Sequence, residues 1–310
     1  MKGKTVLITG GTGSLGQCLV RRILKKRPRK AIVYSRHEDL QVAMRREYIH
    51  EKRLRFFIGD VRDKDRLEMA LRGVDIVIHC AALKHVDVAE YNPFEAVKTN
   101  VIGTQNIIEV AIRQNVGSVL SVSSDKAVNP VNLYGATKLC ADKLIENADS
   151  YAGNYGTKFA TIRFGNFWGS RGSVVPYFEK LKKEGAEYLP ITSDKMTRFF
   201  IKPDDAVSRV FEALKAMKGG EVFCPKMKSA RIQDLAVMIA PNMKTKVVGL
   251  RKGEKLHEEM LTSAETAQTF VHKNFYIVYQ NGNGTGRRVS PNFVYSSENH
   301  LGLDLFSEFN

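Results

Sequence analysis

The stretch SSDKAVNPVNLYGATK, from Ser123 to Lys138, gathers side chains that can move protons. Tyr134 and Lys138 lie four residues apart, so on a helix they would share one face. An ammonium in that position can lower the pKa of the phenol, which would let Tyr134 act as a base toward a substrate hydroxyl. Ser124 is placed to hydrogen-bond the same hydroxyl. The spacing predicts an oxidoreductase that uses a nicotinamide.

Asp125 and Lys126 stand side by side just upstream, directly after an apolar run. Hydride transfer alone requires neither group, so the pair indicates a further step that needs an acid and a base. Lys126 must be neutral to act as the base, which requires a pKa lowered by burial or by nearby positive charge. Adjacent side chains at the end of a strand point in opposite directions, so we expect them not to pair. A surface ion pair at a turn is the alternative.

A glycine-rich turn follows the first apolar run, with glycines at Gly10, Gly13 and Gly16, and a helical pattern comes next. Small residues let the backbone approach a pyrophosphate, and the helix N-terminus stabilises its charge. The strand, turn and helix context therefore predicts a dinucleotide site. A glycine turn without a ligand is the alternative.

The end of the second predicted strand indicates which dinucleotide is bound. NAD enzymes place an acid there to bind the ribose 2′-hydroxyl, but this sequence has Ser35 and Arg36. A guanidinium binds a 2′-phosphate bidentately, so these residues predict NADP. Glu38 follows closely and leaves NAD open.

The elements that must position these residues alternate regularly over the first two-thirds of the chain. Short apolar runs separated by helical patterns predict a doubly wound parallel α/β sheet of the Rossmann type, with a smaller C-terminal substrate-binding lobe. We expect a cofactor-binding domain at 1–165 with a contribution from about 195–223, a substrate lobe at 166–194 and 224–280, and a C-terminal tail at 281–310. The stretch QNGNGTGRRVSP from Gln280 is expected to be flexible, before a last short apolar segment. The predicted strands are Thr5–Ile8, Ala31–Tyr34, a run from Arg55, a run from Val74, a run from Ser118, and Lys158–Phe164.

The composition fits a globular protein that works on anions. The chain has 310 residues and a formal net charge of +15, which suits nucleotides or nucleic acid. The densest basic run, 21–30, has no interleaved aromatic residues, so nucleic-acid binding is only an alternative. Four scattered cysteines indicate neither disulfides nor a metal site. No apolar run approaches the roughly 20 residues that span a bilayer, and we expect a cytoplasmic protein.

The sequence resembles the extended short-chain dehydrogenase/reductases, and within them the soluble bacterial UDP-N-acetylglucosamine 4,6-dehydratases of polysaccharide biosynthesis that invert C5. Ser124 replaces a threonine of that family, and Cys80 replaces a frequent alanine. Retaining relatives usually carry methionine at the position of Tyr134, and ordinary epimerases lack the Asp-Lys pair. The matching stretches cover nearly the whole chain in order: TGGTGSLG, IVYSR, RFFIGDVRD, HCAALKHVDVAEYNPFEAVKTN, SSDKAVNPVNLYGATKLCADKL, RFGNFWGSRGSVVP, MTRFF and RKGEKLHE.

The resemblance implies a set of site residues. The catalytic residues it implies are Ser124, Asp125, Lys126, Tyr134 and Lys138. Besides Tyr134 and Lys138, the implied cofactor-binding residues are Gly10, Thr12, Gly13, Ser14, Leu15, Gly16, Ser35, Arg36, Asp60, Val61, Cys80, Ala81, Ala82, Lys84 and Asn100. The implied substrate-binding residues are Lys84, Asn166, Val174, Thr192, Arg251 and Glu254.

The resemblance also implies a mechanism. Tyr134 would remove the C4 hydroxyl proton while hydride passes from C4 to NADP, giving a 4-keto sugar with an acidic C5 proton. Lys126 would then take that proton, Asp125 would protonate the departing C6 hydroxyl, and hydride would return to C6. The expected partners are UDP-N-acetylglucosamine and further copies of the chain. A C4 epimerase, a C5-retaining dehydratase and a catalytically silent NADP-binding regulator are the alternatives.

Overall fold

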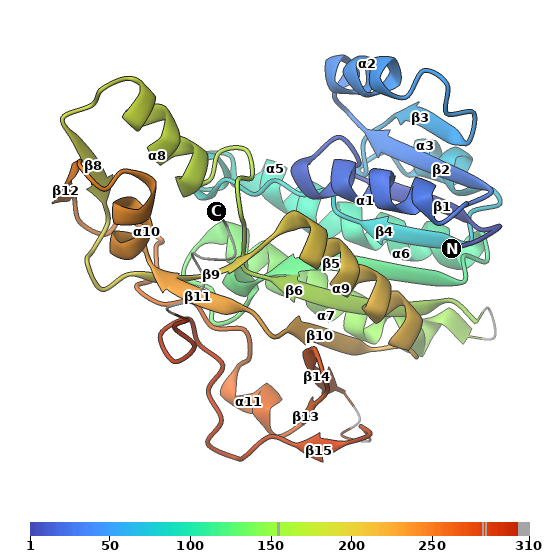
Figure 1. Cartoon of the computed structure of the whole chain (residues 1–310). Helices are drawn as coiled ribbons and strands as arrows, with labels where there is room; N and C mark the ends of the chain where they lie inside the picture. Colours follow the sequence, from blue (N-terminus) through green and yellow to red (C-terminus); the bar gives the residue numbers. More distant parts are fainter. Residues whose placement is uncertain (154–155, 281, 283, 303–310) are drawn as a thin grey trace.

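Ten strands form the central sheet of the computed structural model, which describes residues 1–153, 156–280, 282 and 284–302. Their order is β15-β13-β14-β10-β6-β5-β4-β1-β2-β3, and the strands from β10 to β3 are parallel (Figure 1). The six predicted strands are all confirmed: β1 (Thr5–Thr9), β2 (Lys30–Ser35), β3 (Leu54–Ile58), β4 (Ile76–His79), β5 (Ser118–Ser124) and β6 (Lys158–Phe164).

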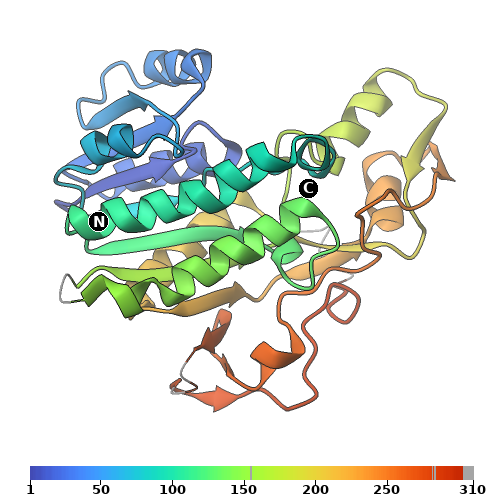
Figure 2. The same ribbon diagram turned by 180° about the vertical axis from the view of Figure 1, so that it is seen from behind.

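Helices cover both faces of this sheet, as a doubly wound fold requires. One face packs against α1 (Ser14–Lys25), α2 (Glu38–Glu47) and α9 (Pro203–Ala216). The other packs against α3 (Lys64–Leu71), α6 (Gly103–Arg113) and α7 (Leu133–Ala152), and the view from behind in Figure 2 shows this side. Within the described ranges, no helix is long and apolar enough to cross a membrane.

Short helical segments connect the strands near the site. Between β4 and α6 lie α4 (Val86–Tyr91), α5 (Pro93–Val97) and a π-helical segment at Lys98–Ile102. A 3₁₀ turn at Asp125–Ala127 joins β5 to the segment before α7.

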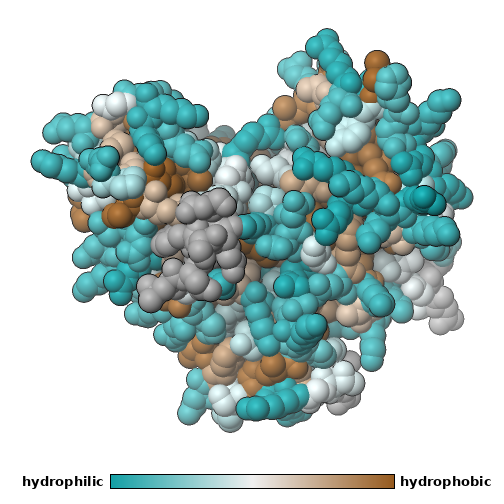
Figure 3. All heavy atoms as spheres, in the orientation of Figure 1, coloured by the Kyte–Doolittle hydropathy of each residue, from teal (hydrophilic) through white to brown (hydrophobic). Residues whose placement is uncertain are grey.

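A small lobe packs beside the carboxyl ends of the parallel strands. Its own apolar core includes Phe178, Leu189 and Leu235. Figure 3 shows a mostly hydrophilic face with a notch between this lobe and the sheet. The lobe contains the sheet β7 (Asn166–Phe167), β9 (Thr197–Ile201) and β11 (Lys228–Arg231), the pair β8 (Tyr188–Ile191) and β12 (Lys244–Val247), and the helices α8 (Val174–Lys183) and α10 (Ile232–Ile239).

The C-terminal part of the chain differs from the predicted division. The strands β10 (Glu221–Pro225), β13 (Thr269–Val271), β14 (Phe275–Tyr279) and β15 (Arg287–Arg288) extend the large sheet, and α11 (Ser263–Thr266) precedes β13. Part of the segment assigned to the substrate lobe therefore belongs to the sheet.

The prediction of a flexible stretch is wrong at Arg287–Arg288, which form β15 and pair with β13. The apolar segment expected after that stretch packs against the sheet. Tyr295 is 1% exposed, and its hydroxyl donates to the Pro225 carbonyl oxygen. Ser297 is also buried, because apolar contacts and hydrogen bonds hold this segment against the sheet. Residues 281, 283 and 303–310 of the predicted tail lie outside the described part.

A fully buried guanidinium joins β6, α7 and α11. Arg163 Nε donates to Asp142 Oδ2 at 3.0 Å, and Arg163 Nη2 donates to Glu265 Oε1 at 2.8 Å. Burial by itself would lower the pKa of Arg163, but Asp142 and Glu265 outweigh it and raise that pKa. The charge therefore persists inside the protein only because these carboxylates compensate it.

Replacing Glu265 with Gln should destabilise the protein strongly, because Arg163 would lose a carboxylate partner in a buried site. Breaking a buried ion pair costs about 3 to 5 kcal/mol in the free energy of unfolding. Urea unfolding measures this change. Glu184→Gln is the control: it removes an exposed carboxylate 3.7 Å from Lys180 and should cost less than about 1 kcal/mol. Equal losses in the two variants would contradict the role of Arg163.

Candidate active site

A cleft of about 820 Å³ opens at the carboxyl ends of the parallel strands, beside the small lobe. In a doubly wound sheet this edge is where ligands bind. Most of the predicted site residues meet here: Gly10, Thr12, Gly13, Ser14, Leu15, Gly16, Ser35, Arg36, Asp60, Val61, Cys80, Ala81, Ala82, Lys84, Ser124, Lys126, Tyr134, Lys138, Asn166 and Val174.

The glycine turn has the close backbone packing that a dinucleotide loop needs. Gly10 has a φ of +64°, and a Cβ there would lie 3.0 Å from the Ala81 backbone nitrogen. At Gly16 a Cβ would lie 2.5 Å from the Gly10 carbonyl oxygen. No side chain caps α1 at Gly13, which is favourable for an anion at this helix N-terminus. The cradle therefore fits a pyrophosphate.

At the other end of the cleft, β2 and β3 bring together the residues expected around the adenosine. Arg36 Nη1 lies 3.4 Å from Asp60 Oδ2, and Gln41 donates to the Ser35 hydroxyl oxygen. Burial by itself would raise the pKa of Asp60, but Arg62 and Arg36 outweigh it and lower that pKa. The guanidinium and hydroxyl line the cleft, whereas Glu38 does not line it.

The catalytic segment owes its shape to a close contact between α7 and the turn before it. Asn132 caps α7 by accepting a hydrogen bond from the Gly135 backbone nitrogen at 2.8 Å. A Cβ at Gly135 would lie 2.2 Å from the Lys126 carbonyl oxygen. Only glycine allows this approach, which brings Tyr134 beside Lys126 at the cleft.

Asp125 and Lys126 do pair, so the prediction that their side chains point apart is wrong. Lys126 Nζ lies 3.0 Å from Asp125 Oδ1, because the 3₁₀ turn replaces extended backbone here. Ser124 Oγ donates to the same carboxylate oxygen at 2.9 Å. Asp125 is completely buried and does not line the cleft, but it contacts two residues that do.

The structure also contradicts the expected pKa of Lys126. Burial would lower this pKa, but the carboxylates of Asp125 and Glu258 outweigh it and raise the pKa above its usual value. Glu258 Oε1 lies 3.6 Å from Lys126 Nζ. Lys126 is therefore an ammonium in this arrangement, and a proton must leave it before it can act as a base.

Lys138 does not lower the pKa of Tyr134 as we predicted. Burial raises that pKa, although Lys126 and a hydrogen bond with Ser124 act in the opposite direction. Lys138 Nζ instead donates to the Val122 carbonyl oxygen at 2.9 Å. Burial lowers the pKa of Lys138 itself.

Four further predicted residues, Asn100, Thr192, Arg251 and Glu254, do not line the cleft. Asn100 lies behind it, where its amide bonds the Leu83 backbone and so holds the loop after β4. Glu254 accepts a hydrogen bond from the backbone nitrogen of Arg251, which stabilises their own loop.

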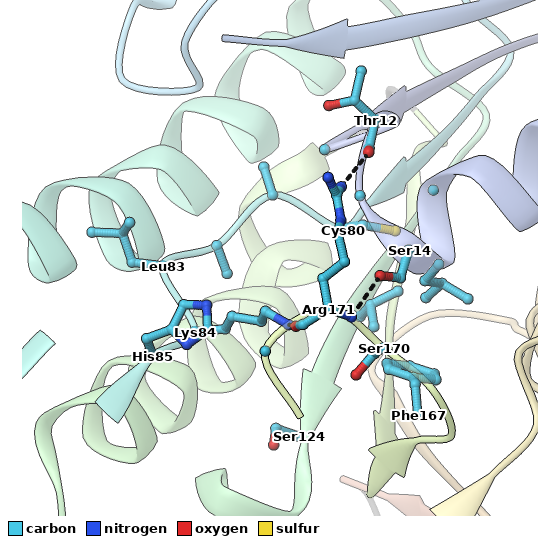
Figure 4. Close-up of a pocket in the computed structure, with 18 of the residues that line it drawn as sticks. Thr12, Ser14, Cys80, Leu83, Lys84, His85, Ser124, Phe167, Ser170 and Arg171 are labelled. Atoms are coloured by element: carbon cyan, nitrogen blue, oxygen red, sulfur yellow. Dashed lines mark hydrogen bonds between the residues drawn. The ribbon is translucent and has the colours of Figure 1, made fainter. Parts of the chain in front are cut away.

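Arg171 lies in the loop 170–176, which the resemblance assigns to contacts with the nicotinamide and the sugar nucleotide, although no separate role was predicted for it. It reaches across the cleft from the loop after β7 (Figure 4). Its Nη2 donates to the Thr12 carbonyl oxygen at 2.9 Å, and its backbone nitrogen donates to Ser14 Oγ at 3.4 Å. Lys84 Nζ donates to the Arg171 carbonyl oxygen at 2.9 Å.

Glu258 was also missed. It is the last residue of the matching stretch RKGEKLHE, but its separation from Lys126 along the chain hides their contact. Among the described residues, no cluster of three or more histidine, cysteine, aspartate or glutamate side chains could hold a metal ion.

Comparisons with known proteins agree with this geometry. The family model described as polysaccharide biosynthesis protein matches residues 6–280. The inverting UDP-N-acetylglucosamine 4,6-dehydratase of Campylobacter jejuni is 47% identical, over 96% of this chain and 93% of that protein. The crystal structure of Pen from Bacillus thuringiensis has a TM-score of 0.93 and 39% identity, covering 99% of this chain and 96% of that one.

A more distant similarity includes a bound cofactor. The structure of the dTDP-glucose 4,6-dehydratase DesIV from Streptomyces venezuelae, which contains NAD, has a TM-score of 0.73 and 25% identity over 81% of this chain and 86% of that one. Dehydratases of this fold thus bind a nicotinamide dinucleotide. From the family match, the identities and the shared architecture, the chain belongs to the polysaccharide biosynthesis protein family within the extended short-chain dehydrogenase/reductases.

Proposed function

We propose that the protein is a UDP-N-acetylglucosamine 4,6-dehydratase that inverts C5. The observation that carries this proposal is the Asp125 and Lys126 pair, which lies against Tyr134 at one cleft of a dinucleotide-binding fold. An oxidation and an elimination need separate groups, and this cleft has both. The nearly full-length similarity to the Campylobacter jejuni dehydratase supports the substrate.

We also propose that the cofactor is NADP. Ser35 and Arg36 line the expected adenosine end, and Glu38 does not line the cleft to repel a 2′-phosphate. The glycine cradle would hold the pyrophosphate, and Lys138 would lie near the nicotinamide ribose. When bound, NADP supplies an acceptor for the C4 hydride and its later return to C6.

In the first step, Tyr134 would take the proton of the C4 hydroxyl. Ser124 is hydrogen-bonded with Tyr134, and Lys126 favours the phenolate electrostatically, so both assist loss of the phenol proton. Both residues line the cleft beside Tyr134. The resulting 4-keto group would make the C5 hydrogen acidic.

In the second step, one proton transfer would prepare both the base and the acid. The proton of the Lys126 ammonium moves along the 3.0 Å contact to Asp125, leaving a neutral amine and a carboxylic acid. Lys126 then takes the C5 proton, and the buried Asp125 gives its proton to the C6 hydroxyl through Ser124, so that water leaves. This restores the ammonium and carboxylate pair. As hydride returns to C6, C5 takes up a proton from water on the face opposite Lys126, which inverts C5, and Tyr134 releases the C4 hydroxyl proton to solvent, so the protons balance.

The proposal also covers the division of the chain, its location and its assembly. The division into a cofactor-binding part and a substrate-binding lobe stays a prediction, as does a cytoplasmic location. Self-association also stays a prediction, which the exposed apolar side chains of Tyr91 and Phe94 on α4 and α5 favour.

Incubation with UDP-N-acetylglucosamine in deuterated water tests the function. Proton NMR should show a new C6 methyl signal and deuterium at C5, because the C5 proton exchanges before hydride returns. Conversion to the galacto sugar would indicate an epimerase instead. Absence of any new sugar from NADP-loaded protein would favour a catalytically silent regulator.

Single substitutions should separate the two steps. Tyr134→Phe should abolish C4 oxidation, so neither product nor C5 exchange forms. Lys126→Ala should allow oxidation but block C5 exchange. Asp125→Asn should keep exchange while slowing loss of the C6 hydroxyl by about 10²- to 10⁴-fold, the usual contribution of general acid catalysis.

Those outcomes are measured by NADPH absorbance and by NMR of the C5 and C6 hydrogens. Glu184→Gln, far from this chemistry on the surface of the small lobe, should retain every step. Normal C5 exchange by Lys126→Ala would show that Lys126 is not the base.

Protein purified without added nucleotide and then denatured should release mainly NADP, which chromatography distinguishes from NAD. Arg36→Ala should weaken NADP binding and leave NAD binding nearly unchanged, because only NADP carries the 2′-phosphate. Lys52→Ala, a change on the loop before β3, is a control that should affect neither. Release of chiefly NAD from the unaltered protein would overturn the assignment.

A further inference from the structure

Glu258 places a second carboxylate against the lysine of the proposed elimination. Its side chain is 3% exposed, and Oε1 lies 3.6 Å from Lys126 Nζ. Asp125 Oδ1 lies 3.0 Å from the same nitrogen. The ammonium of Lys126 therefore lies between two carboxylates from distant parts of the chain.

The backbone of Glu258 is held in a fixed position. Its nitrogen donates to Ser297 Oγ at 2.9 Å, and the Ser297 nitrogen donates to the Glu258 carbonyl oxygen at 2.8 Å. The Ser297 hydroxyl also contacts Thr197 Oγ1 of β9 at 2.7 Å. The segment that carries the Glu258 carboxylate is thus positioned by the segment around Ser297 and by β9.

Two cationic side chains near Glu258 donate hydrogen bonds to backbone carbonyl oxygens. Arg198 Nε lies 3.8 Å from Glu258 Oε1, but its guanidinium donates to the carbonyl oxygens of Thr197, Leu256 and Lys255. Lys255 Nζ lies 3.4 Å from Glu258 Oε2 and donates to the Val128 carbonyl oxygen. Within the described residues, Oε2 accepts no hydrogen bond.

We propose that Glu258 is a positioning residue of the dehydratase: it holds the Lys126 amine beside Asp125 and controls how readily Lys126 removes the C5 proton. This inference rests on the proposed function. Glu258 itself need not touch the sugar, since it does not line the cleft and Lys126 does.

The electrostatic effect of Glu258 has a definite sign. Its negative charge stabilises the ammonium over the neutral amine, as does that of Asp125 from the same turn. Arg198 of β9 opposes both, and Tyr134 of α7 and Lys255 also lie beside this site. Removing the charge of Glu258 should therefore lower the pKa of Lys126.

The test uses the NADP-loaded protein and UDP-N-acetylglucosamine that carries hydrogen or deuterium at C5. Inversion leaves the C5 hydrogen of the product on the face opposite Lys126, so removal of the C5 proton is followed in the forward direction, through the isotope effect of C5 deuterium on the rate. The rate of this isotope-sensitive step is followed by NMR over a series of pH values. For the unaltered protein it should keep rising into the alkaline range, because the carboxylates raise the pKa of Lys126.

Glu258→Gln should shift this rising limb to lower pH by about one to three units, the usual effect of one charge at such a distance. Glu259→Gln is the matched control: this neighbouring carboxylate bonds Asn129, and its loss should leave the limb in place. A profile of Glu258→Gln that coincides with that of the unaltered protein would overturn the proposal. A uniform fall at every pH would also overturn it, because that is the effect of structural damage alone.

A second measurement tests the same proposal if Glu258→Gln folds poorly, and it needs no substrate. Carbon NMR of the lysine ε-methylene groups, with the Lys126 signal assigned through Lys126→Met, follows the titration of Lys126 directly. Glu258→Asp, which draws the carboxylate back by one methylene, should titrate at lower pH than the unaltered protein, and an unchanged titration would contradict the proposal. An unaltered protein that forms no 4-keto sugar would instead contradict the proposed function.

Discussion

The guanidinium of Arg163 carries a charge inside the protein, and its partners come from segments that carry the site. Asp142 belongs to α7, the helix that begins with the Tyr134 region, whereas Glu265 belongs to α11. The segment just before α11 includes Glu258, which contacts Lys126. Because a buried charge tolerates no loss of its partners, this cluster fixes α7 and the C-terminal segment relative to each other. The two elements that pack against Lys126, α7 and the segment before α11, are thereby held in place by the same buried cluster.

The parts of the molecule that depend on local pattern could be predicted from the sequence. Apolar runs of strand length predicted the parallel sheet from β1 to β6, and the glycines of the first turn predicted a dinucleotide site at its edge. The motifs at the strand ends also predicted that Tyr134, Lys126 and Arg36 lie at one cleft, because the carboxyl ends of parallel strands meet at the same edge of the sheet.

The failures arise where a contact joins residues far apart or where a short turn changes direction. Nothing near Lys126 in the sequence reveals Glu258, so the sign of the pKa shift was wrong. The 3₁₀ turn reversed the expected separation of Asp125 and Lys126. Polar and glycine-rich composition after Gln280 hid the strand β15, which forms by pairing with β13. The errors are therefore two tertiary contacts and one local turn that override the tendency of the sequence.

The close contact at Gly135 keeps Tyr134 and Lys126 in a fixed position relative to each other. They are the proposed bases for the C4 hydroxyl proton and the C5 proton. The Lys126 carbonyl oxygen occupies the place where a side chain at position 135 would begin, so the start of α7 rests directly on the turn. Tyr134 therefore cannot shift without Lys126. An epimerase must let the 4-keto sugar turn over between the two hydride transfers, whereas a dehydratase must keep C4 and C5 facing two separate groups. A turn packed against the helix meets the second requirement, which favours elimination over epimerisation in this cleft.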